Sequence, residues 1–269
     1  MQIEQIEEVL VETIELQSES VQRTVRIDFY QHGSDVNAEE IDLLLFNDGQ
    51  DLVTMNFKDI FQGFYQQKSS RPLLVAAIHC GEDRKNEYGM SAGPNHEGHG
   101  ARAAQYERFI IDELLPFIYS RFHQFRFRET SFGGFSLGAL SALDISWNNA
   151  AVFSRVGVFS GSLWWRSLNK DNKEYNQHIH RMMHAQVRND EFGPGLKFFF
   201  ECGEQDEFED RNRNGIIDSI DDTIDLMREL VKKGYREGKD IYYLQLPDGK
   251  HDVASWAKAM PAFLKWGWG

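Results

Sequence analysis

A serine flanked by closely spaced glycines, in the segment Gly133-Gly134-Phe135-Ser136-Leu137-Gly138-Ala139, constrains the fold of this chain more than any other feature. Gly134 and Gly138 stand two residues on either side of Ser136 and complete the pattern G-x-S-x-G. In this pattern the serine occupies a strained turn between a strand and a helix, which pass so close that only hydrogen side chains fit at the glycines. A short strand pattern precedes the motif and a helical stretch of small residues follows it. The sequence therefore predicts a nucleophilic Ser136 hydroxyl at a strand end, and not a plain Gly-rich turn.

Strand and helix patterns alternate along the whole chain. Apolar runs and alternation predict strands at 7–14, 21–30, 41–46, 73–78, 128–132, 156–159, 196–200 and 241–246. Helical periodicity predicts helices at 59–67, 103–122, 139–143, 175–186, 221–234 and 253–266. This alternation predicts a single α/β domain over residues 1–269, with a mostly parallel sheet of about eight strands and helices on both faces. Ligands of such sheets bind at the carboxyl ends of the strands, where Ser136 is expected to lie.

A serine hydroxyl becomes a good nucleophile only when a base removes its proton. In the fold that the G-x-S-x-G motif indicates, the chain order is serine, acid, histidine. His251 directly follows the last predicted strand, and this makes it the candidate base. The acid is expected after the penultimate strand, where Asp206 lies far enough into the loop to turn toward a histidine; Glu204 and Asp210 are the alternatives. The acid would fix the imidazole tautomer without taking the proton itself.

Two backbone N–H groups are needed to stabilise the oxyanion of a tetrahedral intermediate. The first is assigned to Leu137, the residue after the nucleophile, at the start of a helix. The second is assigned to the backbone of Gln50, in the loop after the central strand at 41–46. The alternative interpretation of that loop is a simple tight turn.

Composition excludes several classes of partner. The net charge of −13 disfavours binding to nucleic acid or to anionic membrane surfaces, and no apolar run approaches the roughly 20 residues that span a bilayer. Cys80 and Cys202 give no disulfide framework and are interpreted as buried free thiols. The N-terminal residues lack the apolar core of a signal peptide, so a cytoplasmic location is expected, although a secreted form trimmed of its signal would look the same. Oligomeric state is not predicted.

Several of these segments, taken in order, resemble the Putative esterase family of α/β-hydrolases, which includes esterase D, enterochelin esterases, feruloyl and acetylxylan esterases, and mycolyltransferases. The resemblance covers about residues 40 to 260. The matching stretches are Asn47-Asp48-Gly49-Gln50-Asp51, Arg84 with Asn86-Glu87-Tyr88, the glycine–serine motif, Ser160-Gly161-Ser162-Leu163-Trp164-Trp165, and Gly249-Lys250-His251-Asp252 with Trp256.

The resemblance implies an α/β-hydrolase fold and a serine esterase that acts on a small-molecule ester and requires no cofactor. It also implies that Ser136, Asp206 and His251 form the catalytic triad, with Gln50 and Leu137 as oxyanion donors. Trp164 or Trp165 would border the substrate pocket; the alternative for these two residues is core packing. Many relatives have His-Asp-Gly or His-Gly where this chain has Asn47-Asp48-Gly49, and commonly Pro where it has Gly161. These departures leave the triad intact but weaken any transfer of a substrate.

The segment after the expected acid resembles an EF-hand calcium loop. Oxygen-bearing side chains occupy loop positions one, three, five, nine and twelve, and Gly215 occupies position six. The expected ligands of a structural calcium ion are Asp210, Asn212, Asn214, Asp218 and Asp221. The alternative is an Asx-rich turn in which Asp218 or Asp221 caps the following helix.

Three functions are compatible with these patterns. The first is a serine carboxylic-ester hydrolase that works through an acyl-enzyme. The second is an acyltransferase with the same triad, in which an acceptor alcohol replaces water. The third is a non-catalytic, calcium-stabilised binding module on a hydrolase scaffold. The complete set of serine, acid and histidine favours the first.

Overall fold

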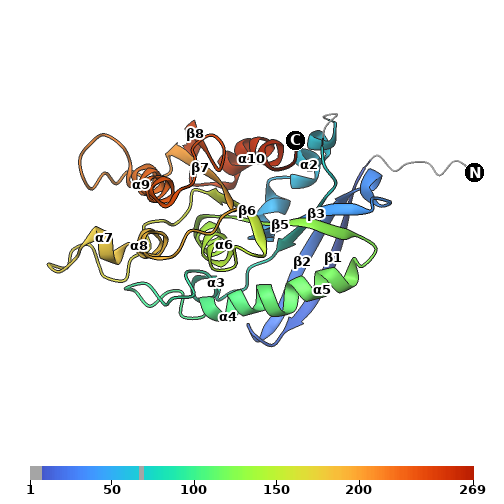
Figure 1. The fold of residues 1–269 in the computed structure, drawn as a ribbon, viewed down its shortest axis with the longest axis horizontal. Coiled ribbons are helices and arrows are strands. Elements are labelled where there is room, and N and C mark those ends of the chain that lie inside the picture. Colours follow the sequence, from blue (N-terminus) through green and yellow to red (C-terminus); the bar gives the residue numbers. More distant parts are fainter. Residues whose placement is uncertain (1–7, 67–69) are drawn as a thin grey trace, which may run out of the picture.

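The computed structural model describes residues 8–66 and 70–269. Its strands form one eight-stranded sheet in the order β1-β2-β4-β3-β5-β6-β7-β8 (Figure 1). The strands are β1 Val9–Ser18, β2 Arg23–His32, β3 Glu40–Asn47, β4 Leu73–Ile78, β5 Arg126–Phe135, β6 Phe153–Phe159, β7 Lys197–Gln205 and β8 Ile241–Lys250. Only the pairs β1–β2 and β2–β4 are antiparallel, and every other pair is parallel. The predicted mostly parallel sheet is thus confirmed.

The sequence pattern of each strand reflects its place in the sheet. β4 is entirely apolar and buried on both faces, as expected for a strand inside a parallel sheet. At the edge, β1 exposes most of its residues and pairs along its whole length with β2.

Helices cover both faces of the sheet (Figure 1). They are α1 Gly49–Thr54, α2 Phe57–Tyr65, α3 Arg84–Glu87, α4 Ala103–Arg108, α5 Leu115–Arg121, α6 Ser136–Asn148, α7 Gln177–His180, α8 Met182–Asn189, α9 Asp218–Lys233 and α10 Val253–Trp268. A 3₁₀ turn, η1, spans Gly33–Asp35, and a π-helical segment, η2, spans Phe109–Leu114. Residues of α1, α2 and α10 form one apolar core against the sheet, and residues of α4, η2, α5, α6, α8 and α9 form a second core on the opposite face.

Two predicted elements differ from the structure in detail. The long helix at 103–122 contains the π-helical segment η2 between α4 and α5. The helix predicted at 175–186 is broken at Arg181, which has an extended backbone and forms a β-bridge with Arg166. The Arg181 guanidinium lies 2.8 Å from Asp222 and 3.0 Å from Asp225, so ion pairs with α9 stabilise the break.

Cys202 is buried as predicted, whereas Cys80 is only partly buried and lies just beyond β4. Both thiols are free. Among the described residues, no helix combines the length and the apolar character that a bilayer-spanning segment needs.

Candidate active site

Ser136 lies between β5 and α6, at the carboxyl edge of the sheet. Its φ of 54° is in the left-handed region, which is costly for a non-glycine residue and is maintained here by close packing. A Cβ atom on Gly134 would lie 2.7 Å from the carbonyl carbon and oxygen of Gly138. Strand and helix thus approach each other too closely for any side chain at Gly134, and this contact holds Ser136 at the apex of the turn.

The imidazole of His251 reaches the serine from the end of β8. Its Nε2 atom lies 2.9 Å from Ser136 Oγ, a hydrogen-bond distance. The ring of Trp256 on α10 contacts the His251 ring edge-on and stacks against Phe135, the neighbour of Ser136. Burial of the ring lowers the pKa of His251, Asp206 counteracts this, and the charge of Arg84 lowers the pKa further. The imidazole is therefore neutral at pH 7 and can accept the serine proton.

A local irregularity brings His251 across the sheet. β5 and β8 are separated by β6 and β7, so their axes lie about 14 Å apart at ~4.8 Å per strand. The pairing of β7 with β8 shifts register between Gly203, which is opposite Leu246, and Gln205, which is opposite Lys250. A Cβ on Gly249 would lie 2.7 Å from the Gly203 Cα. The two strand ends therefore converge, and this directs the residues that follow them toward Ser136.

Asp206 directly follows β7 and is close to this convergence. Its Oδ1 atom lies 2.7 Å from the position that a Cβ on Gly203 would occupy. Burial raises the pKa of Asp206, while Ser160, the Gly203 amide and the charge of His251 lower it. Neither carboxylate oxygen has a hydrogen-bond partner among the described residues. The carboxylate is therefore close enough to His251 to interact electrostatically, without a formed hydrogen bond.

The alternative acids are engaged elsewhere. Glu204 accepts a hydrogen bond of 2.7 Å from Gln245, and Asp210 accepts hydrogen bonds from the backbone of its own loop. A buried carboxyl that the sequence analysis did not select, Glu201, lies on β7, 3.5 Å from the Ser160 hydroxyl. Burial and the nearby charge of Asp206 raise the pKa of Glu201 to about 8. The Glu201 carboxyl is therefore mostly protonated at pH 7. Its burial identifies it as a group with a shifted pKa, and its position in the sequence does not.

The two expected oxyanion donors are at helix N-termini. Gln50 is the second residue of α1 and Leu137 the second residue of α6, and N–H groups at such positions have no partner within the helix. The Gln50 side chain is held by Cys80, whose backbone N–H donates to Oε1 at 3.2 Å. Burial raises the pKa of the Cys80 thiol to about 11, so this neighbour stays neutral. Both backbone N–H groups therefore lack a partner within their own helices, as an oxyanion donor requires.

A buried polar cluster ties these two helix starts together. Asn47 donates from Nδ2 to the Gly138 carbonyl at 2.8 Å and accepts a hydrogen bond of 2.6 Å from Tyr106. Asp48 is fully buried, and Arg84 donates to both of its carboxylate oxygens at 2.7 Å. Bidentate guanidinium–carboxylate pairs fix geometry strongly. The cluster is thus a rigid link between the turn before α1 and the start of α6.

The two tryptophans of the segment after β6 have different environments. Trp165 is 1 % exposed, and its ring fills the space beside Gly89 and Gly100. It belongs to the core, so the expectation that it borders a pocket is wrong for this residue. Trp164 is 38 % exposed and stays available to a substrate.

The Asp210–Asp221 loop is folded on itself. Asp210 and Asn214 accept hydrogen bonds from backbone N–H groups of the loop, and Asn212 and Asn214 donate to Asp221. Asp218 accepts from the Arg211 backbone. The residue before α9, Ile217, provides no side-chain cap, and the Ser219 backbone N–H in the first turn donates to Glu207 instead. Within residues 8–66 and 70–269, no group of three or more His, Cys, Asp or Glu side chains is placed to hold a metal ion. The calcium site stays a prediction.

Solved structures share this fold. The enterobactin esterase FES from Shigella flexneri, crystallised with enterobactin, is 21 % identical with a TM-score of 0.72, over 95 % of this chain and 57 % of that one. A ferulic acid esterase is 15 % identical with a TM-score of 0.70, over 96 % and 97 % of the two chains. The siderophore hydrolase EstA from Aspergillus nidulans is 16 % identical with a TM-score of 0.68, over 99 % and 96 %. This chain thus spans less than three fifths of the enterobactin esterase.

No curated protein sequence matches the chain. The model of one protein family, described as Putative esterase, matches residues 18–266. This match covers nearly the whole chain and agrees with the α/β-hydrolase fold of the structures above. The chain therefore belongs to the Putative esterase family.

Proposed function

We propose that this esterase works through an acyl-enzyme formed on Ser136. The observation that carries the proposal is the 2.9 Å separation of Ser136 Oγ and His251 Nε2, at a turn that presents the hydroxyl at the carboxyl edge of the sheet. A neutral imidazole at hydrogen-bond distance is the arrangement that general-base activation of a serine requires.

In the first half-reaction Ser136 Oγ attacks the ester carbonyl while His251 takes its proton. The resulting oxyanion accepts hydrogen bonds from the backbone N–H groups of Gln50 and Leu137. The imidazolium is stabilised by the Asp206 carboxylate and returns its proton to the departing alkoxide. The product alcohol leaves, and the acyl group stays on Ser136.

In the second half-reaction His251 removes a proton from water, which attacks the acyl carbonyl. The same two N–H groups stabilise the second oxyanion. Collapse of this intermediate breaks the bond to Ser136 Oγ, which recovers its proton from His251. The net reaction converts ester and water into acid and alcohol.

The substrate is proposed to be a small-molecule ester. The similar structures bear the names of siderophore and ferulic acid esterases, so esters of these classes belong in the first panel of compounds. 4-Nitrophenyl acetate and butyrate serve as general probes.

Ser136→Ala tests the proposal against Ser162→Ala as a matched control. Ser162 Oγ lies 3.5 Å from Ser136 Oγ, so the control removes a second hydroxyl from the same place. Ser136→Ala is expected to reduce kcat for 4-nitrophenyl acetate by at least about 10⁴-fold, because the covalent route is lost. Ser162→Ala is expected to stay within about tenfold of the wild type. Equal activity of the wild type and Ser136→Ala would refute the proposal.

A further inference from the structure

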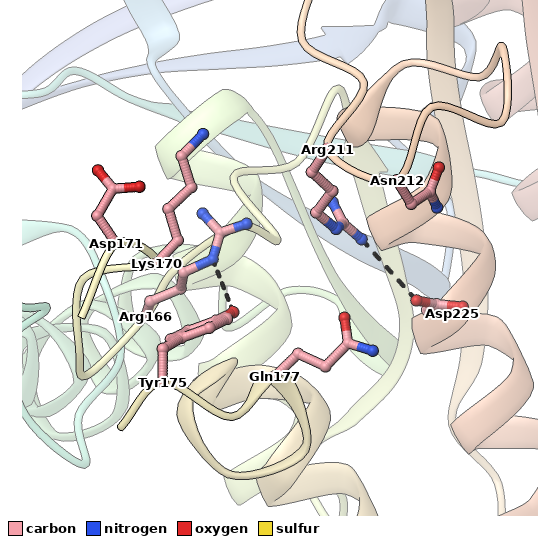
Figure 2. A pocket seen from close by; sticks show the side chains of 8 residues that line it. All are labelled: Arg166, Lys170, Asp171, Tyr175, Gln177, Arg211, Asn212 and Asp225. Carbon is pink, nitrogen blue, oxygen red and sulfur yellow. Dashed lines mark hydrogen bonds and ion pairs between the residues drawn. The ribbon is translucent and has the colours of Figure 1, made fainter. Parts of the chain in front are cut away.

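A polar cavity of about 690 Å³ opens between the segment after β6 and the segment after β7 (Figure 2). None of its lining residues belongs to the proposed triad or to the oxyanion donors. The lining residues are Arg166, Lys170, Asp171, Tyr175, Gln177, Arg211, Asn212 and Asp225. Three of these side chains are cationic, in a chain whose net charge is −13. Two other lining residues, Asp171 and Asp225, are acidic, so an anionic ligand would be selected by individual cationic side chains and not by the summed charge of the lining.

Arg166 is the central group of this cavity. Its side chain is only 9 % exposed, and its Nε donates to the Tyr175 hydroxyl at 3.0 Å. Its Nη2 atom is 3.9 Å from Asp222, which is beyond hydrogen-bond distance. Figure 2 shows its two terminal nitrogens directed away from Tyr175. The Arg166 guanidinium is nearly buried, and within the described residues neither of its terminal nitrogens forms a hydrogen bond.

The acids around the cavity are already paired with other cations. Asp222 lies 2.8 Å from Arg181 and 2.7 Å from Arg211. Asp225 lies 3.0 Å from both Arg181 and Arg228. On the rim, Lys170 pairs with Glu209, and Asp171 is exposed. Both of these ion pairs of Asp222 use its Oδ1 atom, whereas its Oδ2 atom has no hydrogen-bond partner among the described residues and lies 3.9 Å from Arg166. Asp222 therefore offsets the charge of the Arg166 fork without forming a hydrogen bond to it.

The segment that carries Arg166 also contacts the nucleophile. The Ser162 backbone N–H donates to the Ser136 carbonyl at 3.1 Å, and the Trp165 N–H donates to the Ser162 carbonyl at 3.2 Å. Arg166 is four residues after Ser162, so the two Cα atoms are at most about 15 Å apart. Between them lies the half-exposed Trp164, which offers an apolar surface to the middle of a substrate. This upper bound is comparable with the length of an extended ester bound at Ser136.

We propose that this cavity is an anion subsite of the esterase, in which Arg166 binds a carboxylate at the far end of the ester substrate. A carboxylate matches the planar fork of a guanidinium and forms two parallel hydrogen bonds with it. Lys170 and Arg211 lie beside it, each in an ion pair with an acid. The inference rests on the proposed function, because it places the carboxylate on the same molecule that Ser136 attacks.

The experiment compares charged and neutral esters of matched shape. On the acyl side, the substrates are the 4-nitrophenyl monoesters of adipic, suberic and sebacic acid, each against its methyl 4-nitrophenyl diester. On the alcohol side, 4-acetoxycinnamate is compared with 4-acetoxycinnamamide. The measured quantity is the ratio of kcat/KM for the charged ester to that for its neutral partner, at low ionic strength.

The wild type is expected to prefer the charged ester in at least one pair. Arg166→Gln is expected to lower that ratio at least tenfold, and Arg166→Lys to lower it less because the charge remains without the fork. Lys170→Gln changes an exposed residue and is expected to lower the ratio about two- to threefold without affecting folding. Arg126→Gln removes one positive charge at the opposite end of β5, where the side chain is 77 % exposed, and is expected to leave the ratio unchanged.

Equal ratios for wild type and Arg166→Gln in every pair, or an equal fall in Arg126→Gln, would overturn the inference. A separate measurement distinguishes failure of the anion subsite from failure of the proposed function. Binding of 4-hydroxycinnamate to Ser136→Ala is measured by calorimetry, against 4-hydroxycinnamamide. If no ester is hydrolysed but the carboxylate binds and Arg166→Gln abolishes that binding, the subsite stands and the esterase mechanism fails. Hydrolysis of neutral esters without any charge preference or carboxylate binding leaves the mechanism standing and removes the subsite.

Discussion

Gly138→Ala is expected to lower kcat strongly, although it adds only one methyl group and leaves the proposed triad residues in place. A Cβ at this position would lie 2.5 Å from Asp48 Oδ2 and 3.1 Å from the Asn47 Cβ. Asp48 cannot withdraw easily, because Arg84 holds both of its oxygens at 2.7 Å. Gly49 blocks the other direction, since its own Cα is packed against the Ala77 backbone. The new methyl group must therefore push the turn before α1 away from α6.

The expected fall in kcat follows from the residues that this turn positions. It positions Gln50, and α6 positions Leu137, so a displacement separates the two proposed oxyanion donors. Loss of one such donor costs about 2.7–4 kcal/mol of transition-state stabilisation, or roughly 10²–10³-fold in kcat. KM should change little, because the interaction forms in the transition state. Overpacking should also cost about 1–3 kcal/mol of stability, which lowers Tm by roughly 2–12 °C.

Steady-state hydrolysis of 4-nitrophenyl acetate and thermal unfolding followed by circular dichroism measure both effects. Gly63→Ala is the matched control, because a Cβ at Gly63 in α2 meets nothing within 4 Å. The control is expected to keep full kcat and to gain about 0.5–1 kcal/mol of stability, since alanine favours helix. A folded Gly138→Ala variant with wild-type kcat would refute the link between this contact and the oxyanion donors.

Three further predictions concern ionisable groups of the site. The fall of kcat/KM at acidic pH should have its midpoint below pH 6.5, because burial and the charge of Arg84 lower the pKa of His251. Arg84→Gln removes that positive charge and should move this acid limb to higher pH. Asp206→Asn should move the same limb to lower pH and reduce kcat by roughly 10⁴-fold, and an unchanged pH–rate profile would reject Asp206 as the acid. Glu201 has a folded pKa of about 8, so its deprotonation is suppressed in the folded state and its contribution to stability falls as pH rises from the unfolded pKa toward 8. Glu201→Gln should therefore stabilise the protein more at pH 8 than at pH 5, by up to about 1.4 kcal/mol per pH unit, as denaturant titrations at the two pH values would measure.

The elements that carry the proposed chemistry could be located from the sequence because local constraints mark them. Gly134 and Gly138 are required by a close approach of strand and helix, which leaves a short and readable pattern. His251 was found because a residue directly after the last strand of a parallel sheet must lie at its carboxyl edge. The apolar run of β4 gave its bounds without error, because a strand buried on both faces has no polar positions.

Other features depend on contacts between distant segments and leave no local pattern. Trp164 and Trp165 are adjacent and identical, and only the space beside Gly89 and Gly100 decides that Trp165 is the buried one. The helix break at Arg181 arises from a bridge to Arg166 and from ion pairs with α9, neither of which helical periodicity can indicate.

The pairing and burial of the charged groups near the site also leave no pattern in the sequence. Glu201 is an ordinary strand residue until the structure buries it near Asp206. The pair of Asp48 with Arg84 joins residues 36 positions apart on two different turns. Such pairs follow from the packed fold, because burial determines which charges must find partners.

The covalent step on Ser136 is tested most directly by mapping where a fluorophosphonate reacts. Intact-mass spectrometry of the treated wild-type protein, followed by peptide mapping, gives the number and position of adducts. The account predicts a single adduct on Ser136, and strongly slowed labelling in His251→Ala because the base that activates the hydroxyl is lost. An adduct on Ser162 or another residue, or no adduct on a folded protein that still hydrolyses esters, would contradict it.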